Sequence, residues 1–488
     1  SLEIFARLRR NPSLAGWMGL GLAVQAYQKR ARAVVDWLVA LAGATRTRIP
    51  VRLVKGAYWD TEVKRAQMLG LAGYPVFTRK AHTDVSYLAC ARALLDAGDA
   101  VYPMFASHNA HTVAWVAAYA AGKRVADLEF QRLHGMGESL YAQVCAPPHG
   151  HACRVYAPVG SHEDLLPYLV RRLLENGANT SFVHRIADPS VSIADIVADP
   201  AGLAACDGFT ANPLTPLPRA LFADRVNSSG VTPADQPAMV RLDAALADAR
   251  SPRWRAGPIV GGERVAGVER EARDPSDRSR TIGTVVDADE ALVGRALASL
   301  AGAQPAWDAR GGRERAAILA AVADAFEAAT EGFVVRLARE AGKTRMAAIA
   351  EVREAVDFCR YYAACARSHF AEALALPSPT GESNALSLHG RGVFACISPW
   401  NFPLAIFTGQ VAAALAAGNT VAAKPAEQTP LTAALAVEVM LRAGLPADVI
   451  ALLPGRGESV GAALVADPRV AGVAFTGSTE VAATIART

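Results

Sequence analysis

The sequence predicts an α/β protein in two parts, each built on a parallel sheet. Short apolar runs alternate with amphipathic helical patterns over residues 22–180, and the same alternation returns over residues 392–476. Polar residues gather where the apolar runs of the first part end. The 488 residues correspond to about three domains. With 52% hydrophobic and 20% charged residues, the chain is too apolar to be disordered as a whole.

The first part is expected to contain repeated βα units. The expected strands are Leu22–Tyr27, Val51–Lys55, Val76–Thr78, Val101–Ala106 and Leu128–Leu133. Helical patterns lie near 28–42, 60–72, 84–97, 110–121 and 162–176. Such units imply a parallel sheet, either open or closed into a barrel, and a closed barrel of eight strands needs further chain before Ser1. In both architectures, polar residues at strand carboxyl ends predict a ligand site.

A linker and a second α/β unit follow. Residues 186–250 are expected to be a linker with one or two helices, because Asp-Pro and Asn-Pro turns recur there. The second unit is expected to open near residue 251 with a strand and turn at 259–262, and Ala-rich helices at 288–303, 312–329, 331–341 and 346–370. Its repeats are strands at 392–398, 420–424, 449–453 and 470–476, with helices at 404–417, 430–443 and 457–465. This order predicts an open sheet of the nucleotide-binding kind.

Charge, cysteine content and hydropathy exclude several classes of protein. The 50 basic and 46 acidic residues give a net charge of +4 without a basic block, so contact with nucleic acid is not expected. Seven scattered cysteines exclude a disulfide framework or cysteine metal cluster and favour a reducing cytoplasm. Residues 392–423 carry no charge, but Pro399 and Pro403 around Asn401 predict a turn rather than a membrane span. Because the chain opens on Ser1 and 480–488 reads as an unfinished helix, we expect a piece of a longer protein.

Three motifs of the first part are candidates for ligand binding. Arg52 and Lys55 share a strand that ends in Gly-Ala-Tyr-Trp, which indicates either an electron-rich or anionic ligand or an edge strand with solvated charges. His108 and His111 allow a metal site, but because no carboxylate lies nearby two alternatives are favoured: a histidine that donates to a ligand ring, or a histidine whose hydrogen bonds are satisfied within the protein.

The third motif is the helix at 162–176. One of its faces carries Tyr168, Arg171, Arg172 and Glu175 at helical spacing. This face is either solvated or a carboxylate clamp, since paired guanidiniums bind a carboxylate bidentately. In the second reading, Glu175 holds one arginine or meets a substrate amine.

Three further motifs lie in the second part. Asn401, on a turn between two prolines, is placed to donate to an oxyanion. Lys424 and Glu427 follow the next strand and are expected to meet ribose hydroxyls. Residues 475–480 predict a strand, a glycine turn and a helix start, which presents backbone N–H groups to a phosphate. The glycines at 455, 457 and 461 miss the dinucleotide-binding spacing by one residue.

These motifs resemble a known family along nearly the whole chain. VRLVKGAYWD, TRKAHTDVSYLACARALL, FASHNAHT, EFQRLHGMGESLY and CRVYAPVGSHEDLLPYLVRRLLENGANTSFV resemble the proline dehydrogenase barrel of bifunctional proline utilization A. SPWNFPLAIFTGQ, AGNTVAAKPAEQTP and VAFTGSTEVA resemble the first part of an aldehyde dehydrogenase. The two in this order are characteristic of that bifunctional family.

The resemblance implies a fold and an activity. Residues 1–185 are expected to be the C-terminal part of a (β/α)8 barrel that binds FAD and oxidises L-proline to 1-pyrroline-5-carboxylate. Residues 186–250 are then a linker, and 251–488 the N-terminal part of an aldehyde dehydrogenase NAD-binding domain, which oxidises glutamate semialdehyde to glutamate. A quinone acceptor at the membrane surface, a homo-oligomeric parent and a cytoplasmic location peripheral to the inner membrane are also implied.

The motif matches imply roles for individual residues. Arg52 and Asn401 are the expected catalytic residues, with Asn401 as the oxyanion donor. The expected FAD contacts are Gln25, Arg52, Lys55, Gly56, Trp59, Thr78, Lys80, His108, Asn109, Gln131, Glu175, Ser181 and Phe182. The expected proline pocket consists of Tyr58, Leu133, Tyr156, Tyr168, Arg171 and Arg172. The expected NAD site consists of Ile397, Ser398, Pro399, Trp400, Lys424, Glu427, Gly457, Gly461, Phe475, Gly477 and Ser478.

Parts of the family pattern are not matched by this chain. The early barrel strands of the family, which carry a lysine and an aspartate, and the ribbon-helix-helix segment of some members precede the matched region. The family's nucleophilic cysteine and its glutamate follow the turn at Gly477, and Cys359, Cys365 and Cys396 are not expected to replace that cysteine. A second hypothesis therefore stays open, namely a non-catalytic piece that binds a nucleotide or a partner. A DNA-binding repressor needs a basic N-terminal segment that the sequence lacks.

Overall fold

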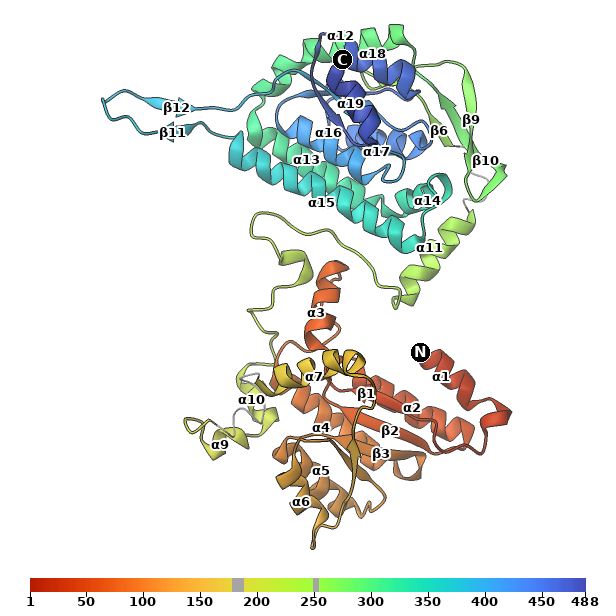
Figure 1. Cartoon of the computed structure of the whole chain (residues 1–488), viewed down its shortest axis with the longest axis vertical. Coiled ribbons are helices and arrows are strands. Elements are labelled where there is room, and N and C mark those ends of the chain that lie inside the picture. The colour runs from red at the N-terminus through yellow and green to blue at the C-terminus, as the bar shows by residue number, and fades with distance from the viewer. Residues whose placement is uncertain (178–187, 249–253) are drawn as a thin grey trace. The chain divides into compact units, whose positions relative to one another are not determined.

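The structure is a computed structural model that describes residues 1–177, 188–248 and 254–488 (Figure 1). The chain divides into two compact units. Unit 1 comprises Ser1–Ala66 and Gly73–Pro216, and unit 2 comprises Gln67–Ala72 and Leu217–Thr488. Among the described helices, none combines the length and the apolar character needed to cross a bilayer.

Unit 1 is built on a parallel sheet whose strands lie side by side in chain order. These strands are β1 (Leu22–Gln25), β2 (Ile49–Val54), β3 (Val101–Ala106), β4 (Glu129–Leu133) and β5 (Ala152–Tyr156). All four pairings are parallel. A doubly wound sheet reverses its strand order, whereas a (β/α) barrel does not. The strand order is therefore that of an arc of a barrel, as the family resemblance implied.

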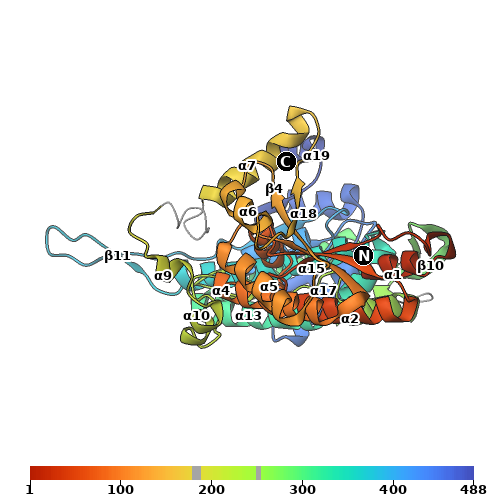
Figure 2. The ribbon, with the colours of Figure 1, turned by 90° about the horizontal axis from the view of Figure 1, so that it is seen from below.

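Helices cover the outer face of this arc. Figure 2 shows α2 (Ala31–Thr45), α4 (Lys80–Asp96) and α5 (Ala110–Lys123) in one layer along the strands. Strand residues alternate between the two faces, so Ile49, Val51 and Leu53 are buried in the core under the helices. Arg52 consequently lies on the opposite, inner face, half-buried.

The remaining elements of unit 1 are shorter or lie at its periphery. They are α1 (Leu2–Arg9), α3 (Trp59–Met68), α6 (Glu138–Cys145), α7 (His162–Gly177), α9 (Ile193–Ile196), α10 (Pro200–Cys206) and 3₁₀ turns at Pro12–Leu14 and Gly98–Ala100. The expected strand Val76–Thr78 is wrong, because Val76 forms only an isolated bridge with Gln28. The fifth strand is instead Ala152–Tyr156, whose residues are mostly exposed and so lack a clear apolar run.

Unit 2 contains an open six-stranded sheet in the order β16-β13-β14-β15-β7-β8. Four strands are parallel, namely β13 (Val393–Ile397), β14 (Thr420–Lys424), β15 (Ile450–Leu452) and β16 (Val470–Phe475). The short strands β7 (Ile259–Val260) and β8 (Glu263–Arg264) are antiparallel additions. From β13 the chain adds β14 and β15 on one side and β16 on the other, so the strand order reverses between β13 and β16.

Helices lie on both faces of the unit 2 sheet. Neighbouring strand residues enter different cores: Cys396 packs with the helices of the larger core and Ala395 with those of the smaller. Burial on both faces explains the nearly continuous apolar runs of these strands. The helices are α11 (Gln236–Asp248), α12 (Glu290–Ala309), α13 (Gly311–Ala328), α14 (Thr330–Glu340), α15 (Arg345–His369), α16 (Ala405–Ala416), α17 (Pro430–Arg442), α18 (Ala462–Ala466) and α19 (Thr479–Arg487).

Unit 2 also contains strands that the sequence did not predict. A three-stranded sheet consists of β6 (Trp254–Ala256), β10 (Asp277–Val286) and β9 (Glu269–Asp274). A hairpin of β11 (Leu374–Leu376) and β12 (Asn384–Leu386) projects from the body of unit 2 (Figure 1). The expected helix at 457–465 is a π-helical turn at Gly457–Gly461 followed by α18.

Candidate functional site

The inner face of the unit 1 sheet carries the first group of predicted site residues. Arg52 Nε donates to Gln131 Oε1 at 2.7 Å, which links β2 to β4. The Arg52 guanidinium carbon lies 5.9 Å from the centre of the Tyr156 ring, at the end of β5. The Tyr156 and Tyr168 rings are 6.5 Å apart. The structure thus brings together one expected catalytic residue, one expected flavin contact and two expected proline contacts.

The loop after β2 is covered by α7. Arg171 Nη1 donates to the Ala57 carbonyl at 2.6 Å, and its guanidinium carbon lies 3.8 Å from the centre of the Tyr58 ring. This stacked cation–π contact holds Arg171 above the loop. The side chains of Arg172 and Glu175, as well as Ser181 and Phe182, lie outside the described residues.

Two lysines expected to contact FAD share one aspartate. Lys55 Nζ is 2.5 Å from Asp84 Oδ1, and Lys80 Nζ is 3.0 Å from Asp84 Oδ2. Burial lowers the pKa of Lys55, and Asp84 only partly offsets this effect. Burial alone raises the pKa of Asp84, but the two lysines outweigh burial and hold that pKa below its usual value. Two cations on one carboxylate leave net positive charge, which suits an anionic ligand.

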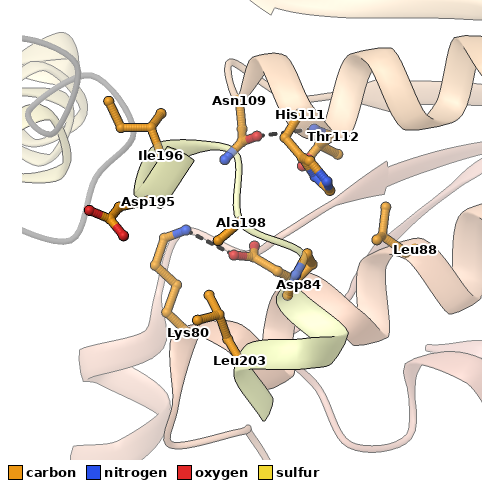
Figure 3. Close-up of a pocket in the computed structure, with 11 residues that line it drawn as sticks. Lys80, Asp84, Leu88, Asn109, His111, Thr112, Asp195, Ile196, Ala198 and Leu203 are labelled. Atoms are coloured by element: carbon orange, nitrogen blue, oxygen red, sulfur yellow. Dashed lines mark hydrogen bonds and ion pairs between the residues drawn. The ribbon is translucent and has the colours of Figure 1, made fainter. Parts of the chain in front are cut away.

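The cavity beside this cluster is small (Figure 3). It is lined by Lys80, Asp84, Asn109, His111 and residues of the 195–203 segment, and its volume is about 50 Å³. A cavity of this volume has room for a few water molecules and not for a ring system. The cavity itself is therefore not the proposed flavin site, although Lys80 and Asn109 border it.

His108 and Asn109 at the end of β3 are held by the backbone. The Leu133 N–H donates to His108 Nε2 at 3.0 Å, so the neutral imidazole carries its proton on Nδ1. Asn109 Oδ1 caps α5 by accepting from Thr112 N–H at 3.0 Å. The residues in 1–177, 188–248 and 254–488 include no group of three or more His, Cys, Asp or Glu placed to hold a metal ion.

The other expected flavin contacts surround the same strand ends. Trp59 Nε1 donates to the Phe77 carbonyl at 2.8 Å, and Thr78 Oγ1 accepts from Asn212 N–H at 2.9 Å. Gly56 has φ of +128°, and an added Cβ would lie 2.5 Å from the Tyr27 ring, so only glycine fits. Gln25 is the last residue of β1 and is half-buried.

The unit 2 site lies where the strand order reverses. Ile397 and Phe475 are paired at the carboxyl ends of β13 and β16. The turn with Asn401 leaves from the first strand and the turn with Gly477 from the second. In an open α/β sheet, this switch point is where ligands bind. Asn401 is exposed, Trp400 is 56% exposed, and Pro399 is half-buried.

A buried ion pair fixes the far end of the Asn401 turn. Glu351 Oε1 accepts from the N–H groups of Leu404 and Ala405 at 2.9 and 3.2 Å, at the start of α16. Lys343 Nζ lies 2.6 Å from Glu351 Oε2 and 4.0 Å from the centre of the Phe402 ring. Because the first amides of a helix lack intrahelical acceptors, the carboxylate satisfies them and holds the turn. Sequence reasoning missed Glu351 and Lys343.

The expected ribose-binding residues lie together at the end of β14. Lys424 is 3% exposed, and its Nζ donates to Pro425 O at 3.1 Å and lies 3.7 Å from Glu427 Oε2. Burial lowers the pKa of Lys424. An added Cβ on Gly461 would lie 3.7 Å from the Lys424 side chain, so the π-helical turn runs beside this lysine, whereas Gly457 is exposed.

Two observations suit a ligand with many hydroxyl and phosphate oxygens. The buried Oγ atom of Ser398 has no hydrogen-bond partner in the described part of the chain. Ser478 Oγ caps α19 by accepting from Val481 N–H at 3.3 Å. The helix start therefore directs backbone N–H groups to one side of the switch point.

The buried cysteines are poor nucleophiles. Cys396 and Cys359 are fully buried, and burial raises the pKa of each thiol to about 12. Such thiols stay protonated near neutral pH, and the thiolate is the reactive form.

The fold and both sites define a class of protein: an arc of a (β/α) barrel with a cationic inner face, joined to a nucleotide-binding type of sheet. Comparison with known proteins agrees. Residues 1–185 match the proline dehydrogenase family model, and 265–488 match the model of the aldehyde dehydrogenase family. The bifunctional protein PutA of Escherichia coli (strain K12) is 50% identical over 499 residues, which cover 100% of this chain and 37% of that protein.

Solved structures give the same result. The Bradyrhizobium japonicum proline utilization A structure superposes with a TM-score of 0.87 at 49% identity and covers 100% of this chain and 46% of that one. The Bdellovibrio bacteriovorus protein gives 0.89 at 34% identity, covering 100% and 50%. This chain is PutA-like, with a proline dehydrogenase module followed by an aldehyde dehydrogenase module, so the expected family and fold class are confirmed. The chain spans 37% of the length of the first curated relatives that it matches.

Proposed function

We propose that this chain belongs to a bifunctional enzyme that oxidises L-proline to glutamate in two steps. Unit 1 oxidises proline to 1-pyrroline-5-carboxylate with FAD. The second module oxidises glutamate semialdehyde, the hydrolysed form of that imine, with NAD⁺. The observation that carries the proposal is the cluster of Arg52, Tyr156, Tyr168 and Arg171 on and above the inner face of a barrel arc.

The described residues fit an FAD molecule. Cationic and hydrogen-bond-donating side chains gather near the carboxyl ends of β2 and β3 and at the start of α4. They are Arg52, Lys55, Lys80, His108 and Asn109. FAD, when bound, accepts the hydride that leaves proline. Arg52 then places positive charge beside the ring, Arg171 with Arg172 binds the substrate carboxylate, and Tyr58, Tyr156 and Tyr168 exclude water. Gln25, Gly56, Trp59, Thr78 and Gln131 complete the proposed flavin site, and Leu133 completes the proline pocket.

The described residues of unit 2 fit NAD⁺. The orphaned Ser398 hydroxyl and the buried Lys424 ammonium face a dinucleotide with many acceptor oxygens. NAD⁺, when bound, supplies the hydride acceptor of the second step. The Asn401 amide is proposed to donate to the oxyanion that forms on the aldehyde. The remainder of the proposed NAD⁺ site consists of Ile397, Pro399, Trp400, Glu427, Gly457, Gly461, Phe475, Gly477 and Ser478.

The proposal includes features of the whole protein. We place the module boundaries at 1–185, 186–250 and 251–488. We also propose a membrane quinone as acceptor of the flavin's electrons, a homo-oligomeric assembly and a cytoplasmic location at the surface of the inner membrane. Oxidation of proline by a dehydrogenase requires an acceptor for the flavin's electrons, and a quinone is suitable.

The proposal is tested by anaerobic reduction. The protein is purified with FAD, and L-proline is added in the absence of oxygen. We expect loss of the visible flavin absorbance with L-proline and none with D-proline. Binding of FAD or NAD⁺ without any reduction by L-proline contradicts the proposal and supports a nucleotide-binding piece without catalysis.

A further inference from the structure

A chain of polar side chains crosses the inner face of the unit 1 sheet from β5 to β2. Arg154 donates from Nε and Nη2 to Glu129 Oε1 and Oε2 at 2.8 and 2.7 Å. Gln131 Nε2 donates to Glu129 Oε1 at 2.6 Å. Gln131 Oε1 accepts from Arg52 Nε at 2.7 Å. Glu129 is 4% exposed and Gln131 is 7% exposed, so the bond between these two side chains is shielded from water, whereas the Arg154 side chain at the β5 end is 67% exposed.

The chemistry of the carboxylate fixes the direction of this chain. An ionised carboxylate only accepts hydrogen bonds, so Gln131 must turn its NH₂ group toward Glu129. Its carbonyl oxygen then faces Arg52, which has only donors. The reverse orientation of the amide would set oxygen against carboxylate and NH₂ against guanidinium. The charge on Glu129 therefore determines that the Gln131 carbonyl oxygen, and not its NH₂ group, contacts Arg52.

The surroundings of Glu129 keep it ionised. The hydrogen bonds from Arg154 are the largest of the effects that lower the pKa of Glu129, and those from Gln131 and Tyr102 add to them. Tyr102 OH donates to Glu129 Oε2 at 3.1 Å. The bonds from Arg154 and Tyr102 join neighbouring strands, the Gln131–Glu129 bond joins residues two apart on β4, and the Gln131–Arg52 bond reaches across β3 to β2.

We propose that Glu129 is a positioning residue for Arg52. Acting through Gln131, it holds the Arg52 Nε–H and so directs the rest of the guanidinium toward the ligand on the inner face. This inference rests on the proposed function, in which that ligand is the flavin. A correctly placed Arg52 stabilises the negative charge of reduced flavin. Glu129 thereby tunes the flavin without touching it.

The direction in which the flavin reduction potential changes distinguishes a positioning role of Glu129 from a direct electrostatic effect of its charge. Replacing Glu129 by Gln removes a negative charge, which by itself stabilises reduced, anionic flavin and raises the reduction potential. If Glu129 positions Arg52, the same variant misplaces the cation and lowers the potential. We expect Glu129→Gln to lower the flavin reduction potential, as we also expect of Arg52→Met. In the Arg52→Met background, Glu129→Gln should cause no further lowering.

A second measurement works without flavin. NMR of the flavin-free chain detects the Arg52 Nε–H signal, which is assigned by its disappearance in Arg52→Lys. Its exchange with water should be at least tenfold faster in Glu129→Gln than in the unaltered chain. The matched control is Asp127→Asn, which removes a carboxylate that lies outside the chain of bonds, two residues before Glu129, and pairs with Arg48. This control should leave both the exchange rate and the potential nearly unchanged.

The outcomes are distinct. A raised or unchanged potential in Glu129→Gln overturns the positioning role, as does an Nε–H exchange rate equal to that of the unaltered chain. If the protein binds no flavin at all, the proposed function fails, whereas the exchange measurement still decides whether Glu129 holds Arg52.

Discussion

The two sites use buried carboxylates in different ways. In unit 1, Glu129 binds side chains of three neighbouring strands and so orients other side chains. In unit 2, Glu351 and Glu340 bind backbone N–H groups at the starts of α16 and α17. Glu340 also accepts from Thr432 Oγ1 at 2.6 Å. The unit 1 site therefore depends on the direction of side-chain hydrogen bonds. The unit 2 site depends on a backbone turn that a buried carboxylate holds in place.

This difference has a consequence for mutation. Removing a carboxylate from unit 1 should change the properties of a bound ligand more than stability. Removing one from unit 2 should cost stability first, because helix amides and a lysine lose their partner in the interior.

The largest expected effect comes from Glu351→Ala. The variant leaves Lys343 and the N–H groups of Leu404 and Ala405 without their acceptor in the interior. Breaking a buried pair in this way costs about 3–5 kcal/mol. The measurement is urea unfolding followed by a signal specific to unit 2. Glu372→Ala, in an exposed pair with Arg313, is the control and should cost about 0–1 kcal/mol. Equal losses in the two variants would contradict the structural role of Glu351.

The next effect concerns the carboxylate clamp on α7. Arg171→Ala should raise the KM for proline at least tenfold, since a charge-assisted hydrogen bond contributes about 1.5–3 kcal/mol. The variant also releases the Ala57 carbonyl and the Tyr58 ring. Arg171→Lys should restore little, because an ammonium lacks the planar fork. An unchanged KM in both Arg171→Ala and Arg172→Ala would show that this helix face is only solvated.

These examples also show what the sequence can and cannot predict. The alternation of apolar residues located β1 to β4 and β13 to β16 within about two residues, because buried strands need such runs. It failed for β5, whose residues are mostly exposed, and for β9 and β10, in which charged and other polar residues interrupt the apolar pattern.

Site residues that carry family motifs could be named from the sequence, and residues that position them could not. Glu351 meets Leu404 across 53 positions, and Arg52 meets Gln131 across 79. No local pattern reveals such partners, because they are chosen by the packing of distant elements. Asp84 is a similar case: its spacing to Lys80 is visible in the sequence, but its contact with Lys55 is not.

A smaller effect is expected from Glu340. Burial raises the pKa of this carboxyl group to about 7, above its ordinary value of 4.5. Between these two values the folded chain binds more protons than the unfolded chain, so this group makes stability fall as the pH rises. The slope is at most about 1.4 kcal/mol per pH unit. Glu340→Gln should remove it, which is measured as the difference in unfolding free energy between variant and unaltered chain from pH 5 to 8. A difference that stays constant with pH would contradict the raised pKa.

The smallest expected effect is none at all, for Cys396→Ser in an assay of aldehyde oxidation. An aldehyde dehydrogenase needs a thiolate that attacks the carbonyl before hydride can leave. Cys396 lies in a buried strand of the larger core, and burial raises its pKa to about 12, so the thiolate is not available near neutral pH. The proposed oxyanion donor Asn401 cannot act without such a nucleophile. We therefore expect the 488-residue chain, given NAD⁺ and pyrroline-5-carboxylate, to form no NADH, and Cys396→Ser to change nothing. Formation of NADH that disappears in Cys396→Ser would show that this buried thiol becomes the nucleophile and that the unit 2 site opens further than its structure indicates.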